Sequence, residues 1–249
     1  MLEGEDDVVG LLTPERLSSY DRVTGSRSRA LRLYEWNMRA SSSVLELTGI
    51  VEVVARNAMD RELCRWSERR HSSRSWFDHV PLDRQGSADL AKARSRAARH
   101  GGAEVHGRVL AELSFGFWRY LVESRYLTAF WTPALHRAFP AGPADILTRQ
   151  RKVRARMQQL HFVRNRAAHH EPIHQRDLHR DHSDAIELLG WINPVAAEWA
   201  TEVASLPAVL DARPSAGGAG SQGARCADAP PGARAVSYTH LTLPTILRV

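Results

Sequence analysis

A long run of apolar residues at helical spacing constrains the fold of this chain more than any other feature. Between residues 27 and 65, one set recurs every seven residues and a second set fills the neighbouring stripe: Leu33, Ala40, Leu47 and Val54, then Val44, Val51 and Ala58. This spacing places both sets on one face of an α-helix, which turns once in about 3.6 residues. A long helix with one apolar face needs other helices to cover that face. The pattern therefore predicts a helical bundle built on this segment.

The other segments up to residue 210 also have helical spacing, and none has the alternation typical of strands. The expected helices cover residues 13–23, 84–99, 105–138, 145–170 and 183–206. Breaks are expected at Gly25, at Gly101 and Gly102, and at three prolines: Pro133, Pro140 and Pro194. We therefore expect a tail at residues 1–15 and one all-α domain at residues 16–210.

Composition and charge limit the function only weakly. The chain of 249 residues is 43% hydrophobic, and no apolar run reaches the roughly 18 residues that a membrane span needs. The acidic N-terminus differs from a secretory signal, and two cysteines, Cys64 and Cys226, form no disulfide framework, so we expect a cytoplasmic protein. The formal charge of +6 comes almost entirely from arginine. This charge is compatible with a polyanionic partner, and the bias toward arginine is equally typical of a GC-rich genome.

The C-terminal segment differs in composition from the rest. Residues 211–235 are rich in Ala, Gly and Pro, and are expected to form a flexible linker. Residues 236–245 match a translation of the transposase mosaic-end adapter that is used to prepare sequencing libraries. We therefore interpret residues 236–249 as a sequencing artefact that carries no function.

The segment 160–172, Leu-His-Phe-Val-Arg-Asn-Arg-Ala-Ala-His-His-Glu-Pro, holds most of the reactive side chains. The imidazole of His169 can move protons near neutral pH, and the guanidinium of Arg164 can hold a phosphate. On a regular helix Arg164 and His169 point about 140° apart, whereas Asn165 and His169 share a face. Two interpretations stay open. Arg164 reaches around to join His169 at one phosphate, or Arg164 pairs with a core carboxylate and His169 caps the helix C-terminus.

Histidines are frequent near this segment, which raises the question of a metal site. They are His161, His169, His170, His174, His179 and His182. Pro172 lies between His170 and His174 and prevents the one-turn spacing of a metalloprotease pair. We therefore expect neither a metal nor another cofactor.

A polar stripe on the long helix has two open interpretations. It contains Glu52, Arg56, Asn57, Asp60 and Arg61. Side chains one turn apart can form pairs on a solvated face. Alternatively, this stripe lies beneath the motif helix and supports it.

Several stretches together resemble the Abi-like family of bacterial abortive-infection proteins, a branch of the HEPN superfamily. The resemblance covers residues 16–205 and is carried by residues 33–37, 52–57, 112–118, 164–172 and 191–194. Its most specific parts are Ser-Phe-Gly-Phe-Trp at 114–118 and Arg-Asn-Arg-Ala-Ala-His-His at 164–170. They are specific in combination, whereas an arginine five residues before a histidine often occurs by chance.

This resemblance implies an HEPN-like helical bundle, a homodimer that brings two motifs together, and metal-independent cleavage of RNA by 2′-hydroxyl transesterification. Arg164 and His169 match the catalytic pair of the superfamily, and Asn165 matches its frequent polar second position. His170 is expected to support His169. The resemblance also implies phage defence or a toxin–antitoxin system, with an antitoxin protein as a partner. Some members bind RNA or a partner protein without cleaving RNA, so a non-catalytic binding module is the alternative.

Overall fold

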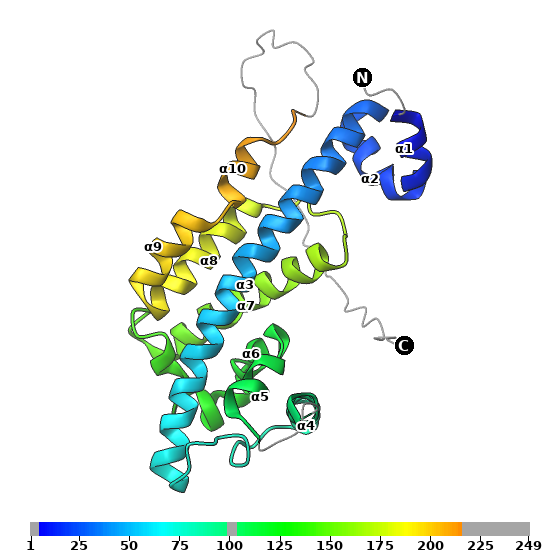
Figure 1. Ribbon diagram of the computed structural model, residues 1–249. Coiled ribbons are helices and arrows are strands. Elements are labelled where there is room, and N and C mark those ends of the chain that lie inside the picture. Colours follow the sequence, from blue (N-terminus) through cyan, green and yellow to red (C-terminus); the bar gives the residue numbers. More distant parts are fainter. Residues whose placement is uncertain (1–4, 99–103, 216–249) are drawn as a thin grey trace, which may run out of the picture. The chain divides into compact units, whose positions relative to one another are not determined.

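The computed structural model describes residues 5–98 and 104–215, and these residues contain helices and no strand (Figure 1). The expected all-α fold is confirmed. The α-helices are α1 (Glu5–Leu12), α2 (Pro14–Thr24), α3 (Arg27–His71), α4 (Arg84–Ala97), α5 (His106–Glu112), α6 (Phe115–Leu121), α7 (Ile146–Ala168), α8 (Leu178–Ile192), α9 (Pro194–Val203) and α10 (Leu206–Asp211). Short 3₁₀ and π-helical turns connect α6 to α7: η2 (Ser124–Tyr126), η3 (Leu127–Trp131) and η4 (Leu135–Ala138).

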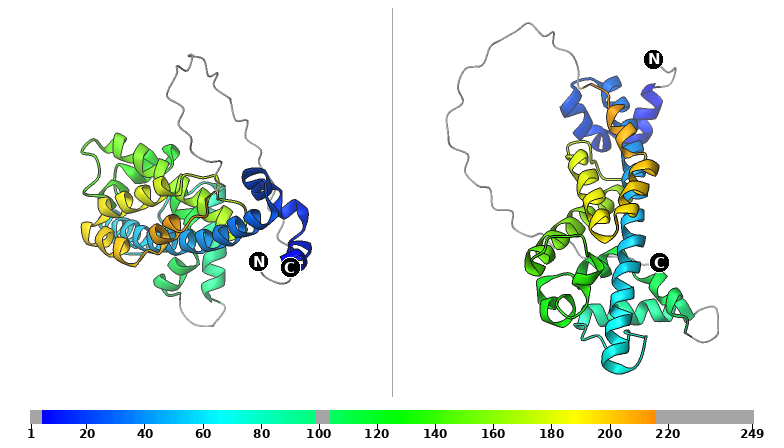
Figure 2. Two further views of the ribbon diagram at one scale, coloured as in Figure 1. Left: turned by 90° about the horizontal axis from the view of Figure 1, so that it is seen from above. Right: turned by 90° about the vertical axis from the view of Figure 1, so that its left-hand side faces the viewer.

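Helix α3 is the segment with the seven-residue repeat, and α2, α7, α8 and α10 pack against it (Figures 1 and 2). It continues past the expected end at residue 65 to His71. No glycine or proline interrupts residues 66–71, and the cations of Arg69 and Arg70 are favourable at a helix C-terminus. Ser72 ends the helix in the left-handed conformation, with φ 54°.

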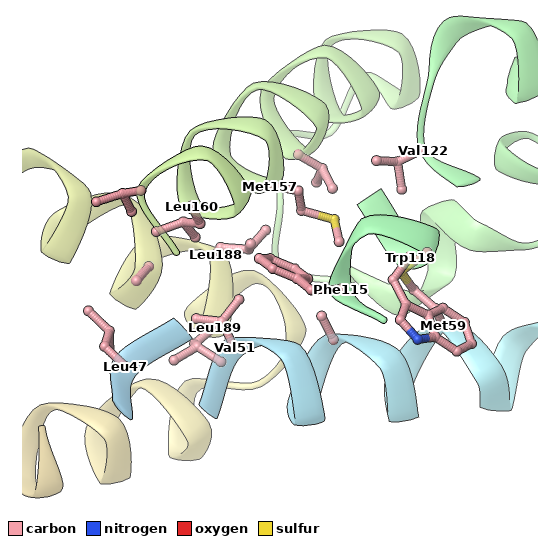
Figure 3. Packing of buried hydrophobic residues seen from close by; sticks show 14 of the residues in the cluster. Leu47, Val51, Met59, Phe115, Trp118, Val122, Met157, Leu160, Leu188 and Leu189 are labelled. Carbon is pink, nitrogen blue, oxygen red and sulfur yellow. The ribbon is translucent and has the colours of Figure 1, made fainter. Parts of the chain in front are cut away.

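The core lies where α3, α6, α7 and α8 meet (Figure 3). Many of its side chains are at most 1% exposed, among them Leu47, Val51 and Met59 of α3, Phe115 and Trp118 of α6, Met157 and Leu160 of α7, and Leu188 and Leu189 of α8. Burying one such side chain contributes about 1.5–3 kcal/mol. This packing fixes α7 against α3 and so positions the motif.

Residues 105–138 depart from the expected arrangement. The chain is extended at Leu113 and Ser114, with ψ 120° and 162°, and these residues separate α5 from α6. The apolar spacing runs through this break because α6 buries its own residues, including Phe117 and Leu121. The break therefore leaves no trace in the hydrophobic pattern.

Polar caps set the ends of the C-terminal helices. The carboxylate of Asp145 accepts a hydrogen bond from the Thr148 N–H (2.7 Å) at the start of α7. The carboxylate of Asp177 accepts a hydrogen bond from the Arg180 N–H (3.0 Å) at the start of α8, so α8 begins before the expected residue 183. Asn193 caps α9, with Pro194 as its first residue, at the expected break.

The N-terminal residues that we expected as a tail include helix α1. The expected stop at Gly101 and Gly102, the linker beyond residue 215 and residues 236–249 lie outside the described residues. Within the described part of the chain, no helix has the length and apolar character to span a membrane.

Candidate functional site

Two polar side chains on α7 flank Asn165 and contact it. Arg164 donates a hydrogen bond from Nη1 to the Asn165 Oδ1 (3.3 Å), and Asn165 Nδ2 lies 3.3 Å from the Nε2 of His161. An amide NH₂ group can only donate, so this Nε2 is the acceptor and the ring carries its proton on Nδ1. Asn165 therefore connects the guanidinium of Arg164 to a neutral imidazole one turn earlier.

Glu52 of α3 faces the same group of residues. Burial raises the pKa of its carboxyl, while the guanidinium groups of Arg164 and Arg56 and the backbone N–H of Phe115 act in the opposite direction. A partly buried carboxylate is stable as an anion only where cations or N–H groups compensate its lost hydration. The charges of Arg164 and Arg56 therefore act on the Glu52 carboxyl at the junction of α3, α6 and α7.

His161 completes this group, although it was not among the site residues predicted from the sequence. Burial, together with the cations of Arg119 and Arg164, lowers its pKa to about 4. Its Nε2 also lies against α6, where a Cβ added to Gly116 would be 3.1 Å away. The sequence could have indicated this role, because His161 precedes Asn165 by four residues and side chains at this spacing on a helix can interact.

His169 lies at the C-terminal end of α7 and is exposed. Its backbone N–H donates to the Asn165 carbonyl (3.0 Å). In the described residues, its imidazole forms no hydrogen bond or ion pair, either with Arg164 or with another residue. Within one chain, Arg164 thus bonds to Asn165, while the side chain of His169 is exposed at the helix end.

His170 is exposed beside it, in the left-handed conformation with φ 55°. Its N–H donates to the Ala167 carbonyl (3.1 Å), and its own carbonyl accepts a hydrogen bond from Arg16 of α2. The next residues are also fixed, because the Ile173 N–H donates to the buried Asn37 Oδ1 of α3 (2.8 Å). The end of the motif is therefore held by α2 and α3.

Aromatic and basic side chains lie next to the motif. Phe162 is 49% exposed, and the guanidinium carbons of Arg166 and Arg176 lie 5.7 and 5.3 Å from its ring centre. These residues line a hollow of about 410 Å³ that also includes His174. Phe162 precedes His169 by about two helical turns, so both lie on one face of α7.

Asn57 lies apart from the other site residues that we predicted. It is exposed and lines a hollow of about 430 Å³ with Val195 and Trp199 of α9. Glu52 and Arg56 of the same polar stripe lie toward Arg164 instead. The structure thus brings Glu52, Arg56, Arg164 and Asn165 together, and it places Asn57 on another side of α3.

No family model, curated protein or solved structure matches this chain.

Proposed function

We propose that the protein is a metal-independent endoribonuclease of phage defence or of a toxin–antitoxin system, of the kind that its resemblance to Abi-like HEPN proteins implies. The main support is the exposed imidazole of His169 at the end of a helix that also carries Arg164, whose guanidinium is hydrogen-bonded to Asn165. The imidazole moves protons, and the guanidinium stabilises the charge that builds up on a phosphate.

In the proposed reaction, the ribose 2′-oxygen attacks the neighbouring phosphorus and the bond from phosphorus to the 5′-oxygen breaks. His169 takes the proton from the 2′-hydroxyl or gives one to the leaving 5′-oxygen. Arg164 binds the phosphate, and Asn165 orients its guanidinium through the hydrogen bond between them. The products are a 2′,3′-cyclic phosphate and a 5′-hydroxyl, so an RNA with a single 2′-deoxyribose at the cleavage position should resist cleavage.

The surface beside His169 suits a single-stranded RNA. The exposed ring of Phe162 offers a face on which a base can stack. The guanidinium groups of Arg166 and Arg176 lie beside this ring, and they pair with Glu171 and Asp181. Because Phe162 and His169 share a face of α7, a strand bound on Phe162 would run toward the imidazole.

A non-cleaving module that binds RNA or a partner protein is the second candidate. One observation favours it: among the described residues of one chain, Arg164 is hydrogen-bonded to Asn165, and no hydrogen bond joins it to His169. Cleavage then requires a second copy to supply the missing group, as the resemblance implies, and a chain that stays a monomer would bind RNA without cutting it.

The deciding experiment is incubation of the purified protein with RNA in excess EDTA. We expect cleavage by the wild type and losses of about 10²–10⁴-fold in His169→Ala and Arg164→Ala, the usual value of an acid–base or charge-stabilising group. His170→Ala should lose less, since its fixed contacts are made by its backbone. His179→Ala, at an exposed histidine of α8, is the matched control and should keep full activity.

Circular dichroism of each variant separates catalysis from folding. Both inactive variants should keep the helical signal, because His169 is exposed and Arg164 is only partly buried. RNA binding without cleavage by the wild type would support the second candidate. Fast cleavage of the 2′-deoxy substrate would rule out the transesterification mechanism.

A further inference from the structure

Three side chains of metal-ligating type converge at the junction of α3 and α5. Asp60 and Cys64 lie one turn apart on α3, and His106 is the first residue of α5. Their ligand atoms all lie within 4.8 Å of one another. The Cys64 Sγ is 3.8 Å from each Asp60 carboxylate oxygen and 3.8 Å from the His106 Nε2. This cluster is separate from the residues that contact Arg164.

The arrangement differs from a nucleophile relay. In a relay, one ring nitrogen of the histidine faces the nucleophile and the other faces the carboxylate. Here the same atom, Nε2 of His106, faces both Cys64 (3.8 Å) and the Asp60 Oδ1 (2.8 Å). Three ligand atoms that point at one position match coordination of a single ion.

We propose that Asp60, Cys64 and His106 bind one zinc ion. A thiolate, an imidazole and a carboxylate form a donor set that zinc accepts, whereas magnesium and calcium prefer oxygen atoms alone. Zinc bonds of about 2.0–2.3 Å separate tetrahedral ligand atoms by about 3.3–3.7 Å. The distances from Sγ already approach this value, and only the pair of His106 and Asp60 has to separate, by about half an ångström.

Neighbouring side chains orient Asp60 and His106, as the residues around a metal site orient its ligands. The indole N–H of buried Trp76 donates to the Asp60 Oδ1 (2.7 Å), which fixes the carboxylate. Phe77 stacks on the imidazole of His106, with ring centres 4.5 Å apart. Trp76 and Phe77 form the loop after α3, so this loop, α3 and α5 build the site together.

Charge and access also fit a divalent cation. Asp60 and a Cys64 thiolate carry two negative charges, which Zn²⁺ neutralises. The His106 side chain is 35% exposed and that of Asp60 is 15% exposed, so solvent reaches the cluster and a water molecule can complete a tetrahedron. The alternative is a metal-free ion pair, in which the hydrogen bond to Asp60 raises the pKa of His106 to about 10.

The test uses the full chain after treatment with a chelator and dialysis. We expect calorimetric titration with zinc chloride to show one ion per chain, and cobalt chloride to produce the thiolate charge-transfer absorption of a Co²⁺–Cys bond. Cys64→Ser and Asp60→Asn should each weaken zinc binding by at least about 100-fold, since each removes a charged ligand. Asn at position 60 keeps the oxygen that accepts from Trp76. Cys226→Ser and His179→Gln are the matched controls and should bind zinc like the wild type.

Thermal unfolding distinguishes the ion from the ion pair. If the cluster binds zinc, added zinc raises the unfolding temperature of the wild type and leaves that of His106→Gln unchanged. With a metal-free pair, His106→Gln lowers the midpoint by the same amount with and without zinc, and that result would overturn the proposal. Wild-type stoichiometry in Cys64→Ser, or cobalt binding without the thiolate band, would overturn it as well. The ribonuclease proposal does not depend on either outcome.

Discussion

At the scale of single residues, burial distinguishes the two imidazoles of the motif helix. His161 lies among α6, α7 and two guanidinium groups, and its pKa is lowered to about 4. His169, two turns later, is exposed. A histidine that stays neutral suits a structural acceptor for Asn165, whereas proton transfer needs an accessible ring.

The lowered pKa of His161 predicts a loss of stability in mild acid. The unfolded chain takes up this proton near the ordinary pKa of 6.5, and the folded chain only near about 4. The stabilising contribution is therefore fully present above pH 6.5, and it decreases as the pH falls toward 4. Urea unfolding across this range should show a steeper loss in the wild type than in His161→Gln, which keeps an acceptor and has no proton to gain.

Glu52 changes the pH dependence of the stability in the opposite direction, because its raised pKa favours the folded state at low pH. Glu52 is present in both the wild type and His161→Gln, so its effect cancels when their unfolding curves are compared. Parallel curves for wild type and His161→Gln would mean that His161 is accessible to protons in the folded state.

At the scale of elements, the close approach of α6 to α7 depends on Gly116. A Cβ at this position would lie 3.1 Å from the Nε2 of His161 and 3.5 Å from the Oγ of Ser114. The missing side chain therefore lets the imidazole sit directly on α6, where it accepts from Asn165.

We expect Gly116→Ala to lower the free energy of unfolding by about 1–2 kcal/mol, because overpacking outweighs the gain in helix propensity. It should also reduce RNA cleavage by displacing His161 and hence Asn165. Gly49→Ala in α3 is the matched control, since nothing lies within 4 Å of the added Cβ. This control should stabilise the protein by about 0.5–1 kcal/mol. A gain of stability in Gly116→Ala, measured by chemical denaturation, would show that α6 and α7 have room for the methyl group.

At the scale of the whole molecule, the different surroundings of Arg164 and His169 are the main constraint on the proposed mechanism. Arg164 is hydrogen-bonded to Asn165 and its charge acts on Glu52, whereas His169 is exposed at the end of α7. A two-fold dimer can place His169 of one copy beside Arg164 of the other.

A mixing experiment tests this arrangement. His169→Ala and Arg164→Ala are each inactive in the proposal, but a mixed dimer contains one complete pair. After unfolding and refolding together, half of the dimers should be mixed, with one of two sites intact, so about a quarter of the wild-type activity should return. Light scattering should show a dimer in every case. A mixture that stays inactive while it dimerises would place both groups of each site within one chain.

Much of the fold could be predicted from the sequence, because helices follow from local spacing. The all-α class, the long α3 and the break at Pro194 depend on apolar periodicity and on proline. The break between α5 and α6 could not be predicted, since the apolar pattern continues through Ser114. The motif residues could be recognised because they cluster in one segment. For Glu52 and Arg56, the sequence left two interpretations open, a solvated face of the helix or a support for the motif helix.

The sequence by itself determined which residues belong to one helix, because neighbours within a few turns are set by the geometry of that helix. It placed Arg164, Asn165 and His169 at the end of α7 and put His161 one turn before Asn165. Only the tertiary structure decided that Glu52 faces Arg164 while Asn57 does not, and that Asp60, Cys64 and His106 meet at one point. These contacts depend on how α3, α5, α6 and α7 pack, and packing between distant helices leaves no local pattern in the chain.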